Sequence, residues 1–255
     1  DTLQNYAREA FHLGPASFRL YGASPHDLPW TAEGFSILNR TFIECKHDYI
    51  AKQLVKRLVK GHLKPDLNIY AHRLAKRSGA PRCPFDTRKF IVIDLFAGSG
   101  NMMFWFHKEL ACRCFGFEKE YEVFKRTKLA LHLMQCPAEL HQVDFEDGLK
   151  WLASQGQIPE DAVIIFVLDP PWGKALTQEH GMDLLQTCPP IPTILDKIVT
   201  AFPAAVLQHR VFPVINLFYK RKREESLAKV LQYFTWVHHG LVPNQKTQGY
   251  IFGRL

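Results

Sequence analysis

The chain has 255 residues, a formal net charge of +7 and an apolar fraction of 47%. This length and composition allow a sizeable core, and they fit one large α/β domain or one domain with an N-terminal appendage. The longest strongly apolar stretch, residues 162–168, has seven residues, whereas a membrane helix needs roughly 20. We therefore expect no membrane association, and the basic balance favours a polyanionic partner such as RNA.

The ends and the cysteines bear on where the protein works. The first residues lack the basic, apolar and small-residue order of a secretory signal, and there is no initiator Met, so the sequence can be a fragment. The six cysteines form no CxxC pair, and none of the twelve histidines sits in an HxxxH or HExxH frame. We predict reduced thiols, an intracellular protein, nuclear or cytoplasmic, and no metal site.

Residues 1–85 show helical periodicity without strand alternation, which predicts a mostly helical N-terminal extension that contributes to the substrate or cofactor site. The clearest segment, 46–65, is expected to end near Gly61 and Pro65. Its apolar positions at helical spacing are Tyr49, Ile50, Leu54, Leu58 and Val59. Basic residues lie among them, and they fit either a solvated surface face or an RNA-facing patch.

From residue 86 to residue 255 the pattern changes to strand, turn and helix in alternation, which is typical of a parallel sheet with crossover helices. The expected strands are 90–95, 112–117, 138–143 and 163–168, and the helices between them are 101–110, 121–134 and 145–156. A helix over 193–202, a strand over 204–211, a helix ending near Tyr233 and closing strands over 235–238 and 249–253 follow. The fold class is therefore α/β, with a Rossmann-like, mainly parallel sheet.

The first of these strands runs into a GxG turn that opens a helix. Glycine lets a ligand approach the backbone closely, because a Cβ would block it. Glu118 ends the next strand, twenty residues after Gly98, where a carboxylate can accept hydrogen bonds from both hydroxyls of an adenosine ribose. The residues expected to line this cofactor site are Asp94, Phe96, Ala97, Gly98, Ser99, Gly100, Asn101 and Glu118.

Two cofactor classes use such a site, and two residues separate them. A dinucleotide usually needs a third glycine for close helix packing, but position 103 is Met. Asp94 would repel a pyrophosphate, whereas it could bind the ammonium of an amino acid. The pattern thus favours S-adenosyl-L-methionine over a nicotinamide dinucleotide. Asp144 is placed to bind the adenine amino group, or to cap the next helix, and Phe145 is available to cover the adenine ring.

The fourth strand ends in Asp169, Pro170, Pro171 and Trp172, the predicted catalytic residues. Two prolines stop sheet pairing abruptly, and their carbonyls are expected to point outward unpaired. An exocyclic amino group offers two donors, which Asp169 and the Pro170 carbonyl can accept while the nitrogen lone pair faces a methyl sulfonium. Trp172 supplies a flat face for a heteroaromatic ring.

With these motifs in order, residues 88–255 resemble the class I methyltransferases that modify exocyclic amino groups. They are most similar to the trimethylguanosine synthases, which methylate guanine N2 of capped small RNAs, and then to bacterial rRNA guanine-N2 methyltransferases. The resemblance implies that Trp172 stacks on the methylated guanine. Lys174 departs from it, because the family stretch has a second glycine there, and Asp169 stands where cap synthases often carry Ser.

The resemblance also extends weakly to residues 34–38, which would bring Phe35 and Ser36 near the cofactor. A cap binder needs a further aromatic residue and cations for a triphosphate. The candidates are Trp30, Arg19, Lys46 and Lys52.

RNA guanine N2, in a cap or in a structural RNA, is the leading acceptor. A small molecule or a protein side chain is the alternative acceptor on the same fold. A catalytically silent binding subunit is a third possibility, although such a subunit would usually have lost the cofactor acids or Asp169.

Overall fold

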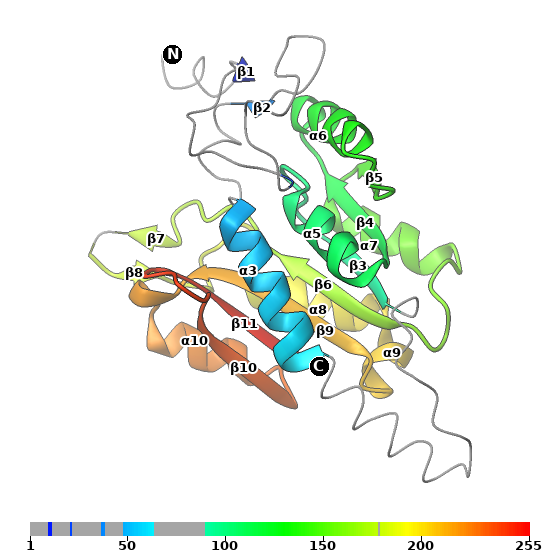
Figure 1. Cartoon of the computed structure of the whole chain (residues 1–255). Helices are drawn as coiled ribbons and strands as arrows, with labels where there is room; N and C mark the ends of the chain where they lie inside the picture. Colours follow the sequence, from blue (N-terminus) through cyan, green and yellow to red (C-terminus); the bar gives the residue numbers. More distant parts are fainter. Residues whose placement is uncertain (1–9, 12–20, 22–36, 39–47, 64–89, 178) are drawn as a thin grey trace.

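The computed structural model describes residues 10–11, 21, 37–38, 48–63, 90–177 and 179–255 (Figure 1). Its centre is a seven-stranded sheet in the order β10-β11-β9-β6-β3-β4-β5. The strands are β3 (Phe90–Asp94), β4 (Arg113–Glu118), β5 (Glu139–Gln142), β6 (Val163–Leu168), β9 (Val211–Phe218), β10 (Trp236–Leu241) and β11 (Gln248–Arg254).

The five strands from β5 to β9 pair in parallel, and β11 pairs antiparallel with both β9 and β10. The chain therefore starts the sheet in its middle at β3, builds one side through β4 and β5, and then crosses to β6 and β9. The prediction of a Rossmann-like, mainly parallel sheet is confirmed. Ligands of such sheets bind outside the carboxyl ends of the strands, where the direction of building reverses.

Helices cover both faces of the sheet (Figure 1). One buried apolar cluster joins the sheet to α3, α5 and α6, and a second joins the opposite face to α7, α8, α9 and α10. Their bounds are α3 (Asp48–Leu58), α5 (Asn101–Leu110), α6 (Tyr121–Leu133), α7 (Phe145–Ser154), α8 (Ile191–Ala201), α9 (Pro203–Leu207) and α10 (Glu224–Leu231).

Met103 shows how α5 packs closely without a third glycine in its own sequence. A Cβ on Gly116 of β4 would lie 2.5 Å from Met103 Sδ, so the glycine that makes room for the helix is in the neighbouring strand. Met103 itself is fully buried.

The N-terminal region contributes α3, which continues into a π-helical turn over Val59–Leu63, and two short paired strands, β1 (Ala10–Phe11) and β2 (Ile37–Leu38). Asp48 is 6% exposed and accepts a hydrogen bond of 2.6 Å from Trp105 Nε1 in α5. Leu54 and Leu58 are fully buried. The helix is therefore packed into the core of the sheet domain. The expected boundary at residues 85 and 86 lies outside the described residues.

Several sequence-based expectations were wrong in detail. Residues 204–211 do not form a strand, because Pro203 opens the short helix α9 and the strand begins only at Val211. Pro213 lies in the interior of β9, where proline is not expected because it has no backbone N–H to donate to a neighbouring strand. Tyr49 was assigned to the apolar face of its helix, yet it is 45% exposed. The hairpin of β7 (Leu176–Thr177) and β8 (Gly181–Met182) was not expected, because each strand has only two residues.

Candidate active site

Four polar side chains gather on one face of the sheet at the carboxyl ends of neighbouring strands. Asp94 ends β3 and is in register with Gly116 of β4 and with Val167 of β6. Side chains alternate between the two faces along a strand. Glu118 lies two residues after Gly116, and Asp169 lies two residues after Val167, so both share the face of Asp94. Leu168 is in register with Ile215, which brings Asn216 beside Asp169. The sheet thus brings together the acids that were predicted from separate motifs.

The glycine turn, which contains Gly98 and Gly100, follows Asp94 at the carboxyl end of β3. Gly98 and Gly100 have φ angles of +49° and +70°, in the left-handed region that favours glycine. Gly98 N donates to Glu118 Oε2 at 3.1 Å, and Thr127 Oγ1 of α6 donates to the Gly98 carbonyl at 2.5 Å. A Cβ on Gly100 would lie 2.9 Å from Thr127 Cγ2. Thr127 therefore fixes the turn, although no sequence motif pointed to it.

Tyr21 also holds the turn, from the N-terminal region. Its backbone N donates to Asn101 Oδ1 at 3.0 Å, and its hydroxyl donates to the Ser99 carbonyl. Its ring makes an edge contact with Phe104, with the centroids 5.4 Å apart. The contacts join positions about 80 residues apart in the chain, so sequence spacing could not reveal them. The N-terminal region thus reaches the predicted cofactor turn through Tyr21.

Asp94 is 2% exposed, and one of its oxygens accepts a hydrogen bond of 3.3 Å from Phe96 N. The pKa of Asp94 is raised from its ordinary value of 3.8 to about 8, chiefly by burial and to a smaller extent by the nearby Asp169 and Glu118 carboxylates. Near pH 7 the isolated carboxyl is therefore neutral. A cationic group beside it would favour the carboxylate, whereas a pyrophosphate would add a further repulsive charge.

Glu118 accepts two backbone hydrogen bonds, from Gly98 N at 3.1 Å and from Glu120 N at 2.9 Å. Burial raises its pKa, and these two hydrogen bonds oppose that shift. They fix the orientation of the carboxylate at the end of β4. Each of its oxygens has a second lone pair, so the group retains acceptor capacity for ribose hydroxyls.

The predicted adenine-binding residues start α7. Asp144 is the N-cap of the helix, and its side chain accepts a hydrogen bond of 3.1 Å from Glu146 N, as the capping interpretation expects. Its second oxygen can still accept a hydrogen bond. Phe145 is 6% exposed and lies against Phe96, with ring centroids 5.2 Å apart. The role of both residues toward adenine stays a prediction.

The Asp-Pro-Pro-Trp segment leaves the sheet after β6. The expectation that both proline carbonyls are unpaired was wrong for Pro171, whose carbonyl accepts a hydrogen bond of 3.0 Å from Cys188 N. The Pro170 carbonyl accepts none within the part of the chain that the structure describes. Trp172 is half-buried, and its ring meets Phe218 edge-on at 6.4 Å. The Pro170 carbonyl, which was predicted to bind the acceptor amino group, therefore remains available to accept a hydrogen bond.

Asn216 is a further polar residue of this site that sequence reasoning missed. It is 1% exposed, and its Nδ2 donates to Asp169 Oδ2 at 3.3 Å. A carboxylate only accepts, which fixes the orientation of the amide. Its Oδ1 is buried and has no hydrogen-bond partner among the described residues. Asn216 therefore orients Asp169 and leaves a buried acceptor beside it.

Other predicted residues cannot be placed at the site. Lys52 lies with its Nζ 4.8 Å from the centre of the Trp105 ring, on the outside of α5. The remaining candidates from the N-terminal region lie outside the described residues: Arg19, Trp30, Phe35, Ser36 and Lys46.

The described residues contain no group of three or more His, Cys, Asp or Glu side chains that could hold a metal ion. None of their helices is long and apolar enough to cross a membrane.

No family model and no curated protein sequence matches the chain. Solved structures of methyltransferases resemble it. Human methyltransferase-like protein 13 in complex with SAH has 15% identity and a TM-score of 0.42, over 65% of this chain and 71% of that one. An rRNA methylase from Streptococcus thermophilus has 16% identity and a TM-score of 0.40, over 66% of this chain and 88% of that one. These values are too low to transfer residue roles to this chain.

Proposed function

We propose that this chain is an S-adenosylmethionine-dependent N-methyltransferase that acts on an exocyclic amino group, with guanine N2 of RNA as the leading acceptor. One observation carries the proposal. A buried carboxyl that needs a cation, Asp94, lies one strand away from a carboxylate and a free carbonyl, Asp169 and Pro170. Asp94 suits the ammonium group in the amino-acid part of the cofactor. Asp169 and the Pro170 carbonyl together suit an amino group with two N–H donors.

The cofactor fits the residues of the glycine turn. Asp94 would bind the ammonium group, and Glu118 would accept the ribose hydroxyls. Gly98 leaves room for close approach to the backbone, because the position of a Cβ there is open, whereas at Gly100 that position is taken by Thr127 of α6. When bound, the cofactor supplies an electrophilic methyl group on a sulfonium. A nicotinamide dinucleotide fits less well, since its pyrophosphate would lie near the two acids Asp94 and Glu118.

The acceptor residues act by positioning. The amino group donates one N–H to Asp169 and the other to the Pro170 carbonyl, which leaves the nitrogen lone pair directed toward the methyl group. Asn216 prevents rotation of the Asp169 carboxylate by its hydrogen bond. Trp172 holds the plane of a heteroaromatic ring by stacking, with Phe218 supporting its edge. In-line transfer needs chiefly this alignment.

RNA is favoured over a small molecule by two properties of the chain. The chain is basic overall, with a formal charge of +7. Its motifs also resemble those of the guanine-N2 methyltransferases of capped and ribosomal RNA. A small-molecule or protein acceptor on the same site is the alternative.

The direct test is transfer of a labelled methyl group from S-adenosylmethionine into three pools: total RNA, total RNA after cap removal, and a mixture of small metabolites and protein. We expect label in RNA that digests to N2-methylated guanosine, and its loss after cap removal would identify the cap as the target. Label confined to metabolites or protein would leave the N-methyltransferase assignment intact and refute RNA as acceptor.

Asp169→Ala serves as the matched variant. It should abolish transfer and leave the cofactor dissociation constant within a few-fold, because Asp169 binds the acceptor. Trp172→Ala should cost about 1–3 kcal/mol of acceptor binding if the acceptor is a nucleobase. Loss of cofactor binding in Asp169→Ala would contradict the proposed division of the site.

A further inference from the structure

Three loops meet at the same edge of the sheet as Trp172. The β7–β8 hairpin follows the Asp-Pro-Pro-Trp segment, and the 3-10 turn over Tyr219–Arg221 follows the carboxyl end of β9. The loop between β10 and β11 reaches this turn, because Lys220 N donates to the Thr247 carbonyl at 3.3 Å. The first two adjoin the predicted acceptor site through Trp172 and Phe218, and the third contacts them through the turn.

The hairpin is fixed on the turn by close backbone contact. Gly181 has a φ of +73°, and a Cβ there would lie 2.0 Å from the Arg221 carbonyl oxygen. Met182 forms a bridge with Lys222, and Arg223 N donates to the Met182 carbonyl at 2.8 Å. The backbone of the hairpin and of the 3-10 turn is therefore held in one arrangement.

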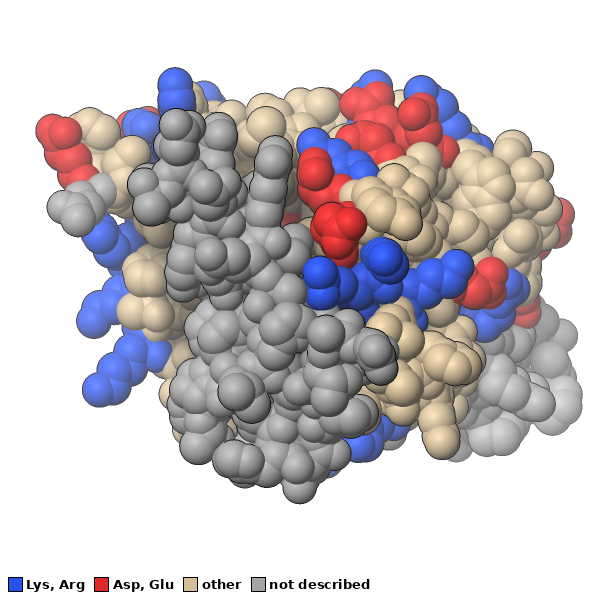
Figure 2. Space-filling model, turned by 90° about the horizontal axis from the view of Figure 1, so that it is seen from above, with Lys and Arg blue, Asp and Glu red and all other residues tan. Residues whose placement is uncertain are grey.

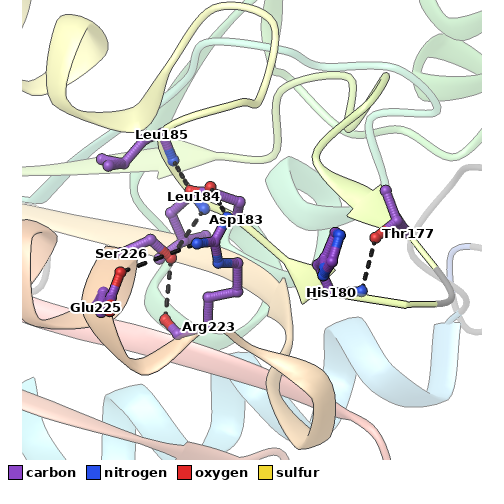
Figure 3. Close-up of polar contacts among 8 residues, drawn as sticks. All are labelled: Thr177, His180, Asp183, Leu184, Leu185, Arg223, Glu225 and Ser226. Carbon is purple, nitrogen blue, oxygen red and sulfur yellow. Dashed lines mark hydrogen bonds and ion pairs between the residues drawn. The ribbon is translucent and has the colours of Figure 1, made fainter.

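Side-chain contacts complete this arrangement, as Figure 3 shows. Arg223 pairs with Asp183 at 2.8 Å, and Ser226 Oγ accepts a hydrogen bond from Leu184 N at 3.2 Å. At the tip of the hairpin, His180 N donates to Thr177 Oγ1 at 3.0 Å. The bonds of Arg223 and Ser226 join the start of α10 to the turn that follows β8.

The acids of these loops already have partners. Asp183 and Glu225 pair with Arg223, Glu224 pairs with Lys222 at 2.9 Å, and Glu179 lies 3.6 Å from His180. Three exposed cations remain: Lys174, Lys220 and Lys246 have no ion-pair partner within the described residues. The left edge in Figure 2, which carries β7 and β8 in Figure 1, shows Lys and Arg side chains projecting outward.

Aromatic groups lie on the same loops as these cations. Lys222 Nζ is 4.2 Å from the centre of the Tyr219 ring, and the Tyr219 hydroxyl is 2.8 Å from His239 Nδ1. Trp172 lies next to Phe218, the residue before Tyr219. Single-stranded nucleic acid is bound by cations that contact its backbone and by aromatic side chains on which its bases stack, and these loops carry both kinds of residue.

We propose that Lys174, Lys220 and Lys246 form a phosphodiester-binding surface that holds the RNA strand flanking the methylated base. The inference rests on the proposed function, from which it takes the acceptor base. It adds the position of the RNA strand on either side of that base. The three ammonium groups replace small cations condensed on the RNA phosphates, and release of these counterions drives binding. A free nucleoside, without flanking phosphates, makes none of these contacts.

The test is the salt dependence of binding to a fluorescently labelled single-stranded RNA oligonucleotide, measured by anisotropy for the complete chain. In K174Q/K220Q/K246Q, the slope of log Kd against log salt should fall by about 0.7 for each lysine, or about two in total. The control, K108Q/K150Q/K229Q, removes the same number of exposed lysines, of which Lys150 pairs with Asp147 and Lys108 lies over the Phe104 and Trp105 rings. These exposed lysines lie in the second halves of α5, α7 and α10, toward the opposite edge of the sheet, and their loss should change the slope much less.

The cofactor dissociation constant and the melting temperature of both triple variants should match those of the parent chain. An unchanged slope in K174Q/K220Q/K246Q, or equal losses in the two triple variants, would refute the surface. The labelled-methyl experiment reports separately on the proposed function. RNA methylation with an unchanged slope refutes only the surface, and a reduced slope without RNA methylation refutes only the acceptor.

Discussion

Asp94 is the residue of the site whose chemistry depends most on burial. Its pKa of about 8 means that the unfolded chain, with an ordinary value of 3.8, releases this proton at lower pH than the folded chain does. The Asp94 contribution to the free energy of unfolding is therefore full below pH 4 and is lost as the pH rises through 8.

Cofactor binding should consequently release a proton. At pH 7 Asp94 is protonated and the cofactor ammonium is charged, so forming the pair requires deprotonation of the carboxyl. We expect affinity to rise with pH toward about 8, near which an α-amino group starts to lose its own proton. Titration calorimetry at pH 7 in two buffers of different ionisation enthalpy measures this release. Asp94→Asn should abolish it, whereas Asp144→Asn should not. Equal heats in the two buffers for the parent chain would contradict the assigned contact.

Asn216 provides a second prediction for single residues. Asn216→Leu removes the Nδ2 donor from Asp169 while keeping the volume of the side chain, and a hydrogen bond to a charged group is worth about 1.5–3 kcal/mol. We expect kcat/KM to fall roughly tenfold to a hundredfold, by that energy, with the cofactor dissociation constant within a few-fold. Steady-state kinetics and cofactor binding check the two quantities. A parallel loss of cofactor affinity would indicate a merely structural role.

At the level of elements, the glycine turn and α6 depend on each other. Gly100→Ala should be destabilising for two reasons: the left-handed backbone costs about 1–2 kcal/mol, and the close Thr127 Cγ2 adds about 1–3 kcal/mol. Thr127→Ser in the same chain removes Cγ2 and keeps the hydroxyl that holds Gly98. It should recover only the second part.

Gly156→Ala separates the two costs. Gly156 has a φ of +62°, and nothing lies within 4 Å of its Cβ position, so it reports the backbone cost alone. Urea denaturation of the four chains gives the free energies of unfolding. If Gly100→Ala cost no more than Gly156→Ala, the packing between turn and helix would be looser than the structure shows.

The elements that were predicted well are those with local signals. Residues 90–168 alternate apolar strands with helices that have one apolar face, and the strand ends carry the acids, so both the sheet and its acidic edge follow from periodicity. The residues that were missed, Tyr21, Thr127 and Asn216, act through contacts across 78–80, 29 and 47 positions. Nothing in their own neighbourhood distinguishes them from ordinary core or surface residues.

For the whole molecule, the prediction is selective stabilisation by ligands. A ligand at about 100 times its Kd that binds only the folded state adds about 2.7 kcal/mol to the free energy of unfolding. S-Adenosylmethionine and S-adenosylhomocysteine should both raise the melting temperature, because both carry the ammonium, ribose and adenine groups. A nicotinamide dinucleotide should not. Scanning fluorimetry with the three ligands tests this. A shift in the melting temperature with the dinucleotide alone would indicate a dehydrogenase and contradict the methyltransferase assignment.

The position of β11 has a consequence for biosynthesis. This strand lies between β9 and β10, both of which precede it in the sequence. Until its residues leave the ribosome, β9 has one open edge and β10 has no partner in the sheet. Open strand edges are sites of aggregation, and chains emerge from their N-terminal end. The nascent protein therefore exposes an open strand edge in the interval between the synthesis of β9 and that of β11, and chaperone demand should concentrate in that interval.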